Sequence, residues 1–374
     1  MWRPATVLPP RWTLSVFPGA SRFCFWRLGA AMRKDLGDVL RRGLSDSCPQ
    51  PLRYEDLRVF PRLPFDRSVF KRSITSPRLA ETLAEVLQLG KNARRGIIIE
   101  CNPGPGFLTK ALLETGASVI ALESHKKFIP HLQSLGEKLN RKLEVVHCDF
   151  FKMDPTRHNL VRPPIVLSQE LFPSLGIEAN SWLEDTPFKV VGMLPMSNEK
   201  KALWKLLHDL YTCSSIYRYG RVELYMLISE SQFEKLIANP TNPYLYHVLS
   251  VLWQVSCEIK LLHKASLKHR NVCFIQMTPR KNLFTEYLTP INYDIFFHMV
   301  KQCFGRRRAL VIQHLHSLTP YDPLTIMNEA NIETKVKPSD IYPQDFKNLF
   351  ETIERSSDDD NKWLYDRVIE DLQC

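Results

Sequence analysis

The segment IIIECNPGPGFLT at residues 97–109 decides the fold, because it joins a run of isoleucines to a glycine turn. Consecutive β-branched residues are typical of a strand inside a parallel sheet, which is covered on both faces. Gly104 and Gly106 permit backbone angles and close approaches that a Cβ would prevent, and helical spacing of apolar residues resumes at Phe107. The sequence therefore predicts a strand, a turn and a helix whose free N-terminal amides can hold an anionic or nucleotide-like ligand.

Two acids follow at the ends of the next two predicted strands. The strand at 118–122 ends in Glu123, and the strand at 143–147 is followed by Asp149. An acid about 20 residues past a glycine turn is where the ribose hydroxyls of a bound nucleotide find an acceptor in such folds. The alternatives are a surface glutamate after an ordinary βαβ turn and, for Asp149, a helix cap.

The alternation of strands and helices continues along the chain. A helix capped by Ser76 is predicted at 77–89, strands at 188–192 and 221–229, and a further helix at 200–211. Such alternation predicts an α/β fold built on a parallel sheet.

Length and composition limit the class of protein. A chain of 374 residues is long enough for two domains, and 44% hydrophobic with 24% charged residues is typical of a soluble globular protein. No stretch approaches the roughly 18 apolar residues of a membrane helix, so we expect no membrane span. The nine cysteines contain no CxxC pair and support neither a disulfide framework nor a zinc site.

Charge and proline content divide the chain into five predicted parts. Residues 1–33 carry arginines and no acid, which predicts a mitochondrial transit peptide, with a disordered basic arm as the alternative. Residues 34–66 are read as a flexible linker, 67–282 as the α/β domain and 283–350 as a helical nucleic-acid-binding domain. The acidic tail at 351–374 has a net charge of −5 beside a basic body. A tail that competes with nucleic acid for the basic surface fits this pattern, and solvated disorder is the alternative.

A cluster of three arginines is the predicted nucleic-acid contact. Arg306, Arg307 and Arg308 precede apolar residues at helical spacing, so we predict that they lie in the first turn of a helix. Cations at that end oppose the helix dipole unless an anion is near, and a phosphate backbone would supply one. A solvated cluster and pairing with the acidic tail are the alternatives.

Taken together, these segments resemble the rRNA adenine dimethyltransferases, S-adenosylmethionine-dependent enzymes that methylate N6 of adjacent adenosines in small-subunit rRNA. The resemblance covers about residues 66–320 and rests on the motifs ECNPGPGFLT, ALES, HCDF, VVGMLP, HVLSVLWQ and CFGRRRALVIQHL in this order. It implies a seven-stranded Rossmann-like methyltransferase sheet with a small helical C-terminal domain. The nearest resemblance is to the mitochondrial branch whose members assist transcription. That branch implies the matrix and nucleoid as location, and mitochondrial RNA polymerase, promoter DNA and small-subunit rRNA as partners.

Site residues carry over by their positions in these motifs. The resemblance implies that S-adenosyl-L-methionine is the cofactor, with its ribose hydroxyls bonded to Glu123 and its adenine amino group to Asp149. Ile74 would pack against the donor, while Gly104 and Gly106 would let the backbone approach its methionine end. We assign no catalytic residue and no metal ligand.

The target-base motif departs from the family. Where the family has Asn-Leu-Pro-Tyr, residues 193–196 read MLPM, and methionine has neither an amide to orient an amine nor an aromatic face. The Gln-Asn-Phe-Leu segment is KRSI at 71–74, and the first glycine of the turn is Asn102. Because adenine N6 is a poor nucleophile, positioning the flipped base is most of the catalysis. We therefore expect that the pocket for the methyl donor is retained and that the groups that position the target adenine are lost.

Three functions remain open at this point. The import signal, basic body and altered motif favour a mitochondrial transcription initiation factor that works with the organelle's RNA polymerase. The retained Glu123, Asp149 and glycine turn favour an active rRNA dimethyltransferase, and the two functions are compatible. An inactive structural subunit of the mitochondrial ribosome is the third.

Overall fold

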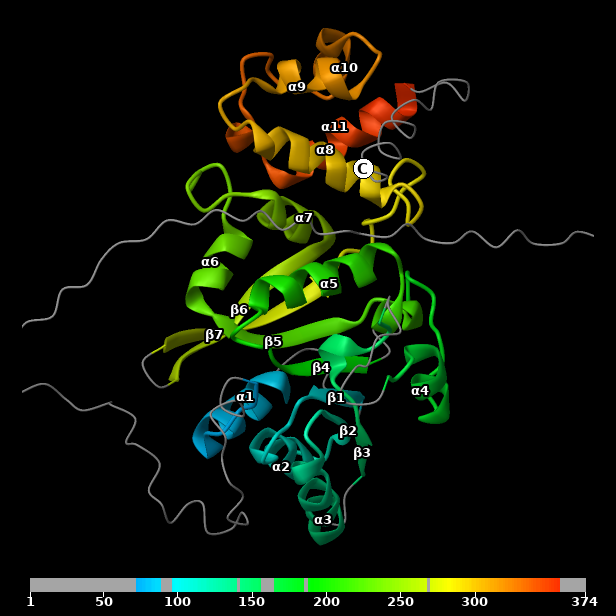
Figure 1. The fold of residues 1–374 in the computed structure, drawn as a ribbon, viewed down its shortest axis with the longest axis vertical. Helices are drawn as coiled ribbons and strands as arrows, with labels where there is room; N and C mark the ends of the chain where they lie inside the picture. The colour runs from blue at the N-terminus through cyan, green and yellow to red at the C-terminus, as the bar shows by residue number, and fades with distance from the viewer. Residues whose placement is uncertain are drawn as a thin grey trace, which may run out of the picture.

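A twisted sheet with helices on both faces and a group of helices at one end forms the structure, a computed structural model (Figure 1). It describes residues 72–88, 96–139, 142–155, 165–184, 188–267 and 270–356. The predicted transit peptide and linker, and most of the predicted acidic tail, lie outside the described residues.

The sheet has seven strands, in agreement with the fold that the family resemblance implies. Their order is β3-β2-β1-β4-β5-β7-β6, and β7 runs antiparallel to β5 and β6 whereas the other pairs are parallel. The strands are β1 (Ile97–Cys101), β2 (Ser118–Glu123), β3 (Leu143–His147), β4 (Phe188–Met193), β5 (Glu223–Ser229), β6 (Cys257–Leu267) and β7 (Arg270–Pro279). Because chain order reverses on either side of β1, a crevice for ligands is expected at the carboxyl ends of β1 and β4.

A close contact between β1 and β4 fixes this end of the sheet. Gly192 lies opposite Cys101 in the register, and a Cβ on Gly192 would be 2.8 Å from the Cys101 Cβ and 2.9 Å from its carbonyl oxygen. Only glycine therefore fits at position 192, directly before the altered target-base motif.

Alternate residues of the strands face two separate layers of helices. Val191 and Met193 pack with α1 and α2, whereas Val190 and Leu194 pack in the larger cluster that holds α5 and α7. The helices of these layers are α1 (Pro77–Gln88), α2 (Phe107–Glu114), α3 (Ile129–Leu139), α4 (Ser168–Ser174), α5 (Glu199–Tyr211), α6 (Glu230–Ile237) and α7 (Val248–Ser256). The predicted helix after Ser76 is confirmed, and the Ser76 Oγ accepts a hydrogen bond from the Leu79 amide at 3.4 Å.

The C-terminal helices form the group at the top of Figure 1 and share the core of the sheet. Trp253 of α7, Phe296 and Phe350 belong to one continuous buried cluster. The helices are α8 (Tyr293–Gly305), α9 (Val311–Leu318), α10 (Pro323–Glu329) and α11 (Pro343–Ser356). α11 continues to Ser356 with Thr352 and Ile353 buried, so the first residues of the predicted acidic tail belong to this helix.

Two general features follow from the described part of the chain. None of its helices is both long enough and apolar enough to span a bilayer. Its His, Cys, Asp and Glu side chains form no group of three or more that could hold a metal ion.

Candidate functional site

The glycine turn between β1 and α2 is built as the sequence predicts. Gly104 and Gly106 have φ angles of 60° and 85°, in the left-handed region that a side chain disfavours. A Cβ on Gly106 would also approach Leu132 Cδ2 to 2.8 Å. Asn102 stands where the family has its first glycine and adopts φ 50°, a conformation that asparagine tolerates better than most residues. The turn therefore survives this substitution.

Glu123 closes the turn from the end of β2. Its Oε2 accepts a hydrogen bond from the Gly104 amide at 2.7 Å, and its Oε1 accepts one from the His125 amide at 2.6 Å. Burial raises the pKa of this carboxyl, and the two amide bonds oppose the rise. Because the side chain is only 1% exposed, the surface-glutamate alternative is wrong. A bond to ribose hydroxyls stays a prediction.

Asp149 is buried two residues beyond β3, and each of its oxygens already has a bonding partner. Its Oδ1 accepts a hydrogen bond from the Phe151 amide at 3.2 Å, so it caps the short 3₁₀-helix Phe150–Lys152, as the capping alternative states. Its Oδ2 lies 3.2 Å from Arg72 Nη1 and 3.7 Å from Lys152 Nζ. Binding of an adenine amino group remains a prediction, and that group would meet Arg72 at this carboxylate.

Glu100 is a third acid at this end of the sheet, and no role was predicted for it from the sequence. It is 2% exposed near the end of β1, and its Oε2 has no hydrogen-bond partner among the described residues. Burial raises its pKa to about 8, and the Glu123 charge adds to the rise. The available signal was an acid directly after three isoleucines, because a fully covered strand also covers that acid.

Ile74, the remaining predicted donor contact, is 4% exposed and packs among side chains of α1 and α2. Its side chain is therefore part of the core, and a donor contact stays a prediction.

The altered target-base motif follows β4. Met193 is 2% exposed and packs in the cluster that contains Val191 and Leu227, and Leu194 is fully buried. Met196 is half-buried against the same cluster. The side chains of this motif are thus apolar and mostly occupied in packing, so they offer no hydrogen-bonding group to an incoming base.

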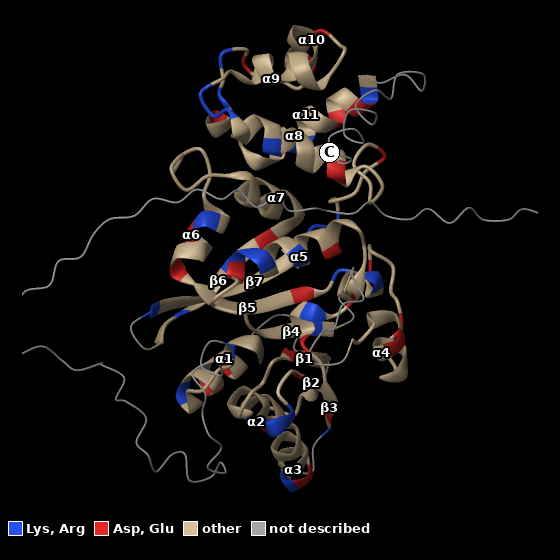
Figure 2. Cartoon of the chain, viewed as in Figure 1, with Lys and Arg blue, Asp and Glu red and all other residues tan. Residues whose placement is uncertain are grey.

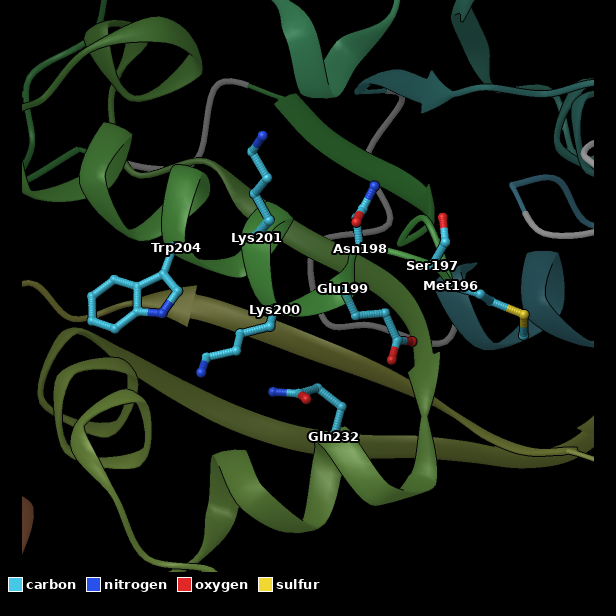
Figure 3. Close-up of a pocket in the computed structure, with 8 residues that line it drawn as sticks. All are labelled: Met196, Ser197, Asn198, Glu199, Lys200, Lys201, Trp204 and Gln232. Atoms are coloured by element: carbon cyan, nitrogen blue, oxygen red, sulfur yellow. The ribbon is translucent and has the colours of Figure 1, made fainter. Parts of the chain in front are cut away.

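A cavity of about 540 Å³ opens beside this motif, between the start of α5 and α6 (Figure 3). The Glu199 carboxylate in its wall is held by Ser229, through the amide at 2.7 Å and the hydroxyl at 2.5 Å. Lys200 and Lys201 of the wall are exposed, whereas the Trp204 ring packs against Phe297 and lies 5.4 Å from Lys301 Nζ. The lining residues are Met196, Ser197, Asn198, Glu199, Lys200, Lys201, Trp204 and Gln232.

The arginine cluster does not lie in the first turn of a helix, so that prediction is wrong. Arg306 is the C-cap of α8, and Arg307 and Arg308 lie in the connection to α9. α9 starts later because the Leu310 amide donates a hydrogen bond to the Gln313 side chain at 3.0 Å, which caps the helix there. Cations at the C-terminal end of α8 are favoured by the helix dipole, so the argument for a compensating anion falls.

The three arginines also differ in their environments. Arg307 donates a hydrogen bond to the Tyr246 carbonyl, and its guanidinium carbon lies 5.3 Å from the centroid of the Phe304 ring. Arg306 and Arg308 are exposed. Arg307 therefore ties the α8–α9 connection to the chain before α7, although it is exposed like the other two.

Cations from several helices converge around His247. Burial lowers the pKa of His247 to about 4, and the charges of Lys200, Lys235 and Arg307 add to the effect. Figure 2 shows basic residues on α5, α6, α8 and the α8–α9 connection. We call the surface formed by Lys200, Lys201, Lys235 and Arg306–Arg308 the basic face.

The sheet, the glycine turn and the acids at the ends of β2 and β3 together define an S-adenosylmethionine-dependent methyltransferase fold. The chain matches the family model described as ribosomal RNA adenine dimethylase over residues 71–355. It belongs to this family, as its motifs predict.

Individual relatives support the assignment. The chain is 52% identical to "Dimethyladenosine transferase 2, mitochondrial" of Homo sapiens, over 99% of this chain and 100% of that protein. It is 47% identical to the Mus musculus protein of the same name, with 99% of each covered. A solved dimethyladenosine transferase from Plasmodium falciparum has a TM-score of 0.52 at 14% identity, over 74% of this chain and 95% of that one, and so has the same fold.

The residues at the turn fit S-adenosyl-L-methionine, the methyl donor of this family. Buried Glu123 and Asp149 provide acceptors for hydroxyl and amino groups, and Gly104 and Gly106 carry no Cβ and adopt positive φ angles in the turn. The unpaired Oε2 of Glu100 is a buried acceptor suited to a further amino group. When bound, the donor supplies an activated methyl group.

Proposed function

We propose that this protein is a mitochondrial transcription initiation factor that works with mitochondrial RNA polymerase to bind and open promoter DNA. The observation that carries the proposal is the end of β4. There Met193 is buried in an apolar cluster and Met196 is half-buried against it, at the two positions where the family resemblance implies an asparagine and a tyrosine for the target base. A protein that has lost this part of catalysis while keeping a basic face is suited to holding nucleic acid rather than modifying it.

The proposed location is the mitochondrial matrix and its nucleoid. The relatives are named as mitochondrial proteins, and the first 33 residues have the composition of a transit peptide. Mitochondrial RNA polymerase and promoter DNA are the proposed partners.

A second candidate function is dimethylation of adjacent adenosines in mitochondrial small-subunit rRNA. The donor set favours it, because Glu123 and Asp149 remain buried at the strand ends and the glycine turn is intact. Both functions use a nucleic acid on the same basic face, so one chain can perform both.

Run-off transcription from a promoter template with purified mitochondrial RNA polymerase tests the first function, beside methyl transfer to a small-subunit rRNA hairpin. We expect the parent chain to support promoter-dependent transcription. We expect Asp149→Ala to keep this activity, because opening a promoter requires no methyl transfer. Loss of transcription in an Asp149→Ala chain with a normal melting temperature would argue that the donor site and promoter opening are linked.

Replacing Arg306 and Arg308 together with alanine should weaken promoter binding irrespective of sequence. Phosphate contacts release counterions, so each lost contact should reduce the slope of log affinity against log salt by roughly one unit. Arg307 is left in place because it is bonded to Tyr246. The measurement is DNA affinity over a salt series. Lys260→Ala with Lys264→Ala is the matched control, since these exposed lysines on β6 are paired with acids. Equal slopes for parent and arginine variant would remove the basic face from promoter binding.

A further inference from the structure

We propose that Arg72 competes with the adenine of S-adenosyl-L-methionine for Asp149, so that donor binding requires the Arg72 head group to leave this carboxylate. The inference rests on the donor site of the proposed function, in which Asp149 receives the adenine amino group. It goes beyond that function by naming a residue of this chain that lowers the affinity for the donor.

Of the two Asp149 oxygens, Oδ1 is bonded to a backbone amide and Oδ2 to Arg72, so Arg72 occupies part of the acceptor capacity of Oδ2. Oδ1 accepts the Phe151 amide as the cap of a 3₁₀-helix, and Oδ2 lies 3.2 Å from Arg72 Nη1. The Asp149 side chain is 2% exposed, so an amino group has little other access to it. Any ligand that uses Oδ2 as an acceptor therefore meets the guanidinium first.

The strengths of the two bonds explain why the contact matters. A guanidinium and a carboxylate form a charge-assisted hydrogen bond, which is roughly twice as strong as a bond from a neutral donor such as an adenine amino group. Because the Asp149 side chain is buried, dissolved salt also screens the attraction between the two charges less than it would at the surface. Exchange of Arg72 for adenine thus replaces a stronger bond by a weaker one, and the remaining donor contacts have to offset the difference.

The backbone beside Arg72 is anchored, so the contact is a built feature of the fold. Ser73 and Ile74 are buried at 7% and 4% exposure, and α1 begins at Pro77. Arg72 lies where the family segment Gln-Asn-Phe-Leu has its asparagine. The substitution places a cation beside Asp149 where the family has a neutral amide.

The same contact is reversible. The Arg72 side chain is 31% exposed, so its guanidinium borders solvent while Asp149 stays buried. The guanidinium can therefore move into water without unfolding its surroundings. This predicts a weak donor site rather than a closed one.

Calorimetric titration with S-adenosyl-L-methionine, S-adenosylhomocysteine and adenosine tests the inference on Arg72→Ala and Arg72→Asn. We expect each variant to bind each ligand about tenfold more tightly than the parent chain, since one charge-assisted bond no longer opposes binding. Adenosine is the informative probe, because it contains the adenine and lacks the methionine end. Arg72→Lys keeps a cation near Asp149, so its affinity for these ligands should increase less than that of the other two variants.

Two controls separate Arg72 from general charge and from the donor site itself. Lys152→Ala removes the other cation near Asp149, whose Nζ is at 3.7 Å and whose side chain is 44% exposed, and should change affinity less than Arg72→Ala. Asp149→Ala should abolish the gain when it is combined with Arg72→Ala.

The possible failures are distinguishable. Unchanged or weaker binding in Arg72 variants with normal melting temperatures overturns the inference, and so does undetectable binding in parent and variants alike. If Asp149→Ala binds donor as well as the parent does, the donor-site assignment itself is wrong. If only Asp149→Ala loses binding and the Arg72 variants match the parent, the competition alone is wrong.

Discussion

Replacing Glu100 with glutamine should raise the free energy of unfolding at pH 8 by up to about 4 kcal/mol. Burial raises the pKa of this carboxyl in the folded chain from 4.5 to about 8. Between these two values the unfolded chain has released the proton and the folded chain still holds it. The Glu100 contribution to stability is therefore fully present below pH 4.5 and is lost as the pH rises toward 8. Glutamine has the shape of the protonated acid and does not titrate.

Urea unfolding across this pH window measures the effect, with circular dichroism as the signal. The free energy of unfolding of the parent should fall as the pH rises. The part of this fall that is due to Glu100 should be absent from Glu100→Gln. Glu85→Gln, at an exposed position of α1, is the matched control and should follow the parent. Parallel curves for parent and Glu100→Gln would show that Glu100 is not held protonated.

Restoring the family's target-base motif should accelerate methyl transfer by about 100-fold. The change is Met193→Asn together with Met196→Tyr, which supplies an amide for the adenine amino group and a ring for the base. Single-turnover transfer from saturating S-adenosyl-L-methionine to a small-subunit rRNA hairpin measures it. Because Met193 lies in an apolar cluster, an amide there should cost about 1–3 kcal/mol of stability in the free protein.

Met193→Leu with Met196→Leu is the apolar control, which should keep the parent's rate. A folded restored chain that methylates no faster than this control would contradict the view that the β4 motif limits the chemistry. It would also leave the transcription proposal without its main structural support.

The parts of the site that the sequence predicts are those set by local patterns. Three isoleucines before two glycines specify β1, the turn and α2, and Glu123 and Asp149 were found because parallel strands bring their carboxyl ends to one edge. The number of strands in the sheet came from the family resemblance, and their order was not predicted, since hydrophobic periodicity carries no information about which strands are neighbours.

The features that the sequence analysis missed depend on distant contacts. Arg72 and Asp149 are 77 positions apart, and nothing in either segment indicates the other. The three arginines were predicted in the first turn of a helix, but α9 begins only at Val311. The start of this helix is set by the bond between the Leu310 amide and the Gln313 side chain, which apolar spacing does not indicate. Burial of Glu100 likewise follows from the coverage of β1 by its neighbours.

The single core that joins the C-terminal helices to the sheet has a mechanical consequence. Trp253, Phe296 and Phe350 are packed in one buried cluster. Among the described residues, the C-terminal helices and the sheet are therefore not joined by a flexible hinge. A DNA duplex bound to the basic face, as proposed, would therefore contact a rigid protein surface. Any misfit between that body and straight B-form DNA must then be relieved by bending or unstacking the DNA, whose flexible pyrimidine–purine steps yield first. Rigidity of the protein would thus direct binding energy into distortion of the promoter.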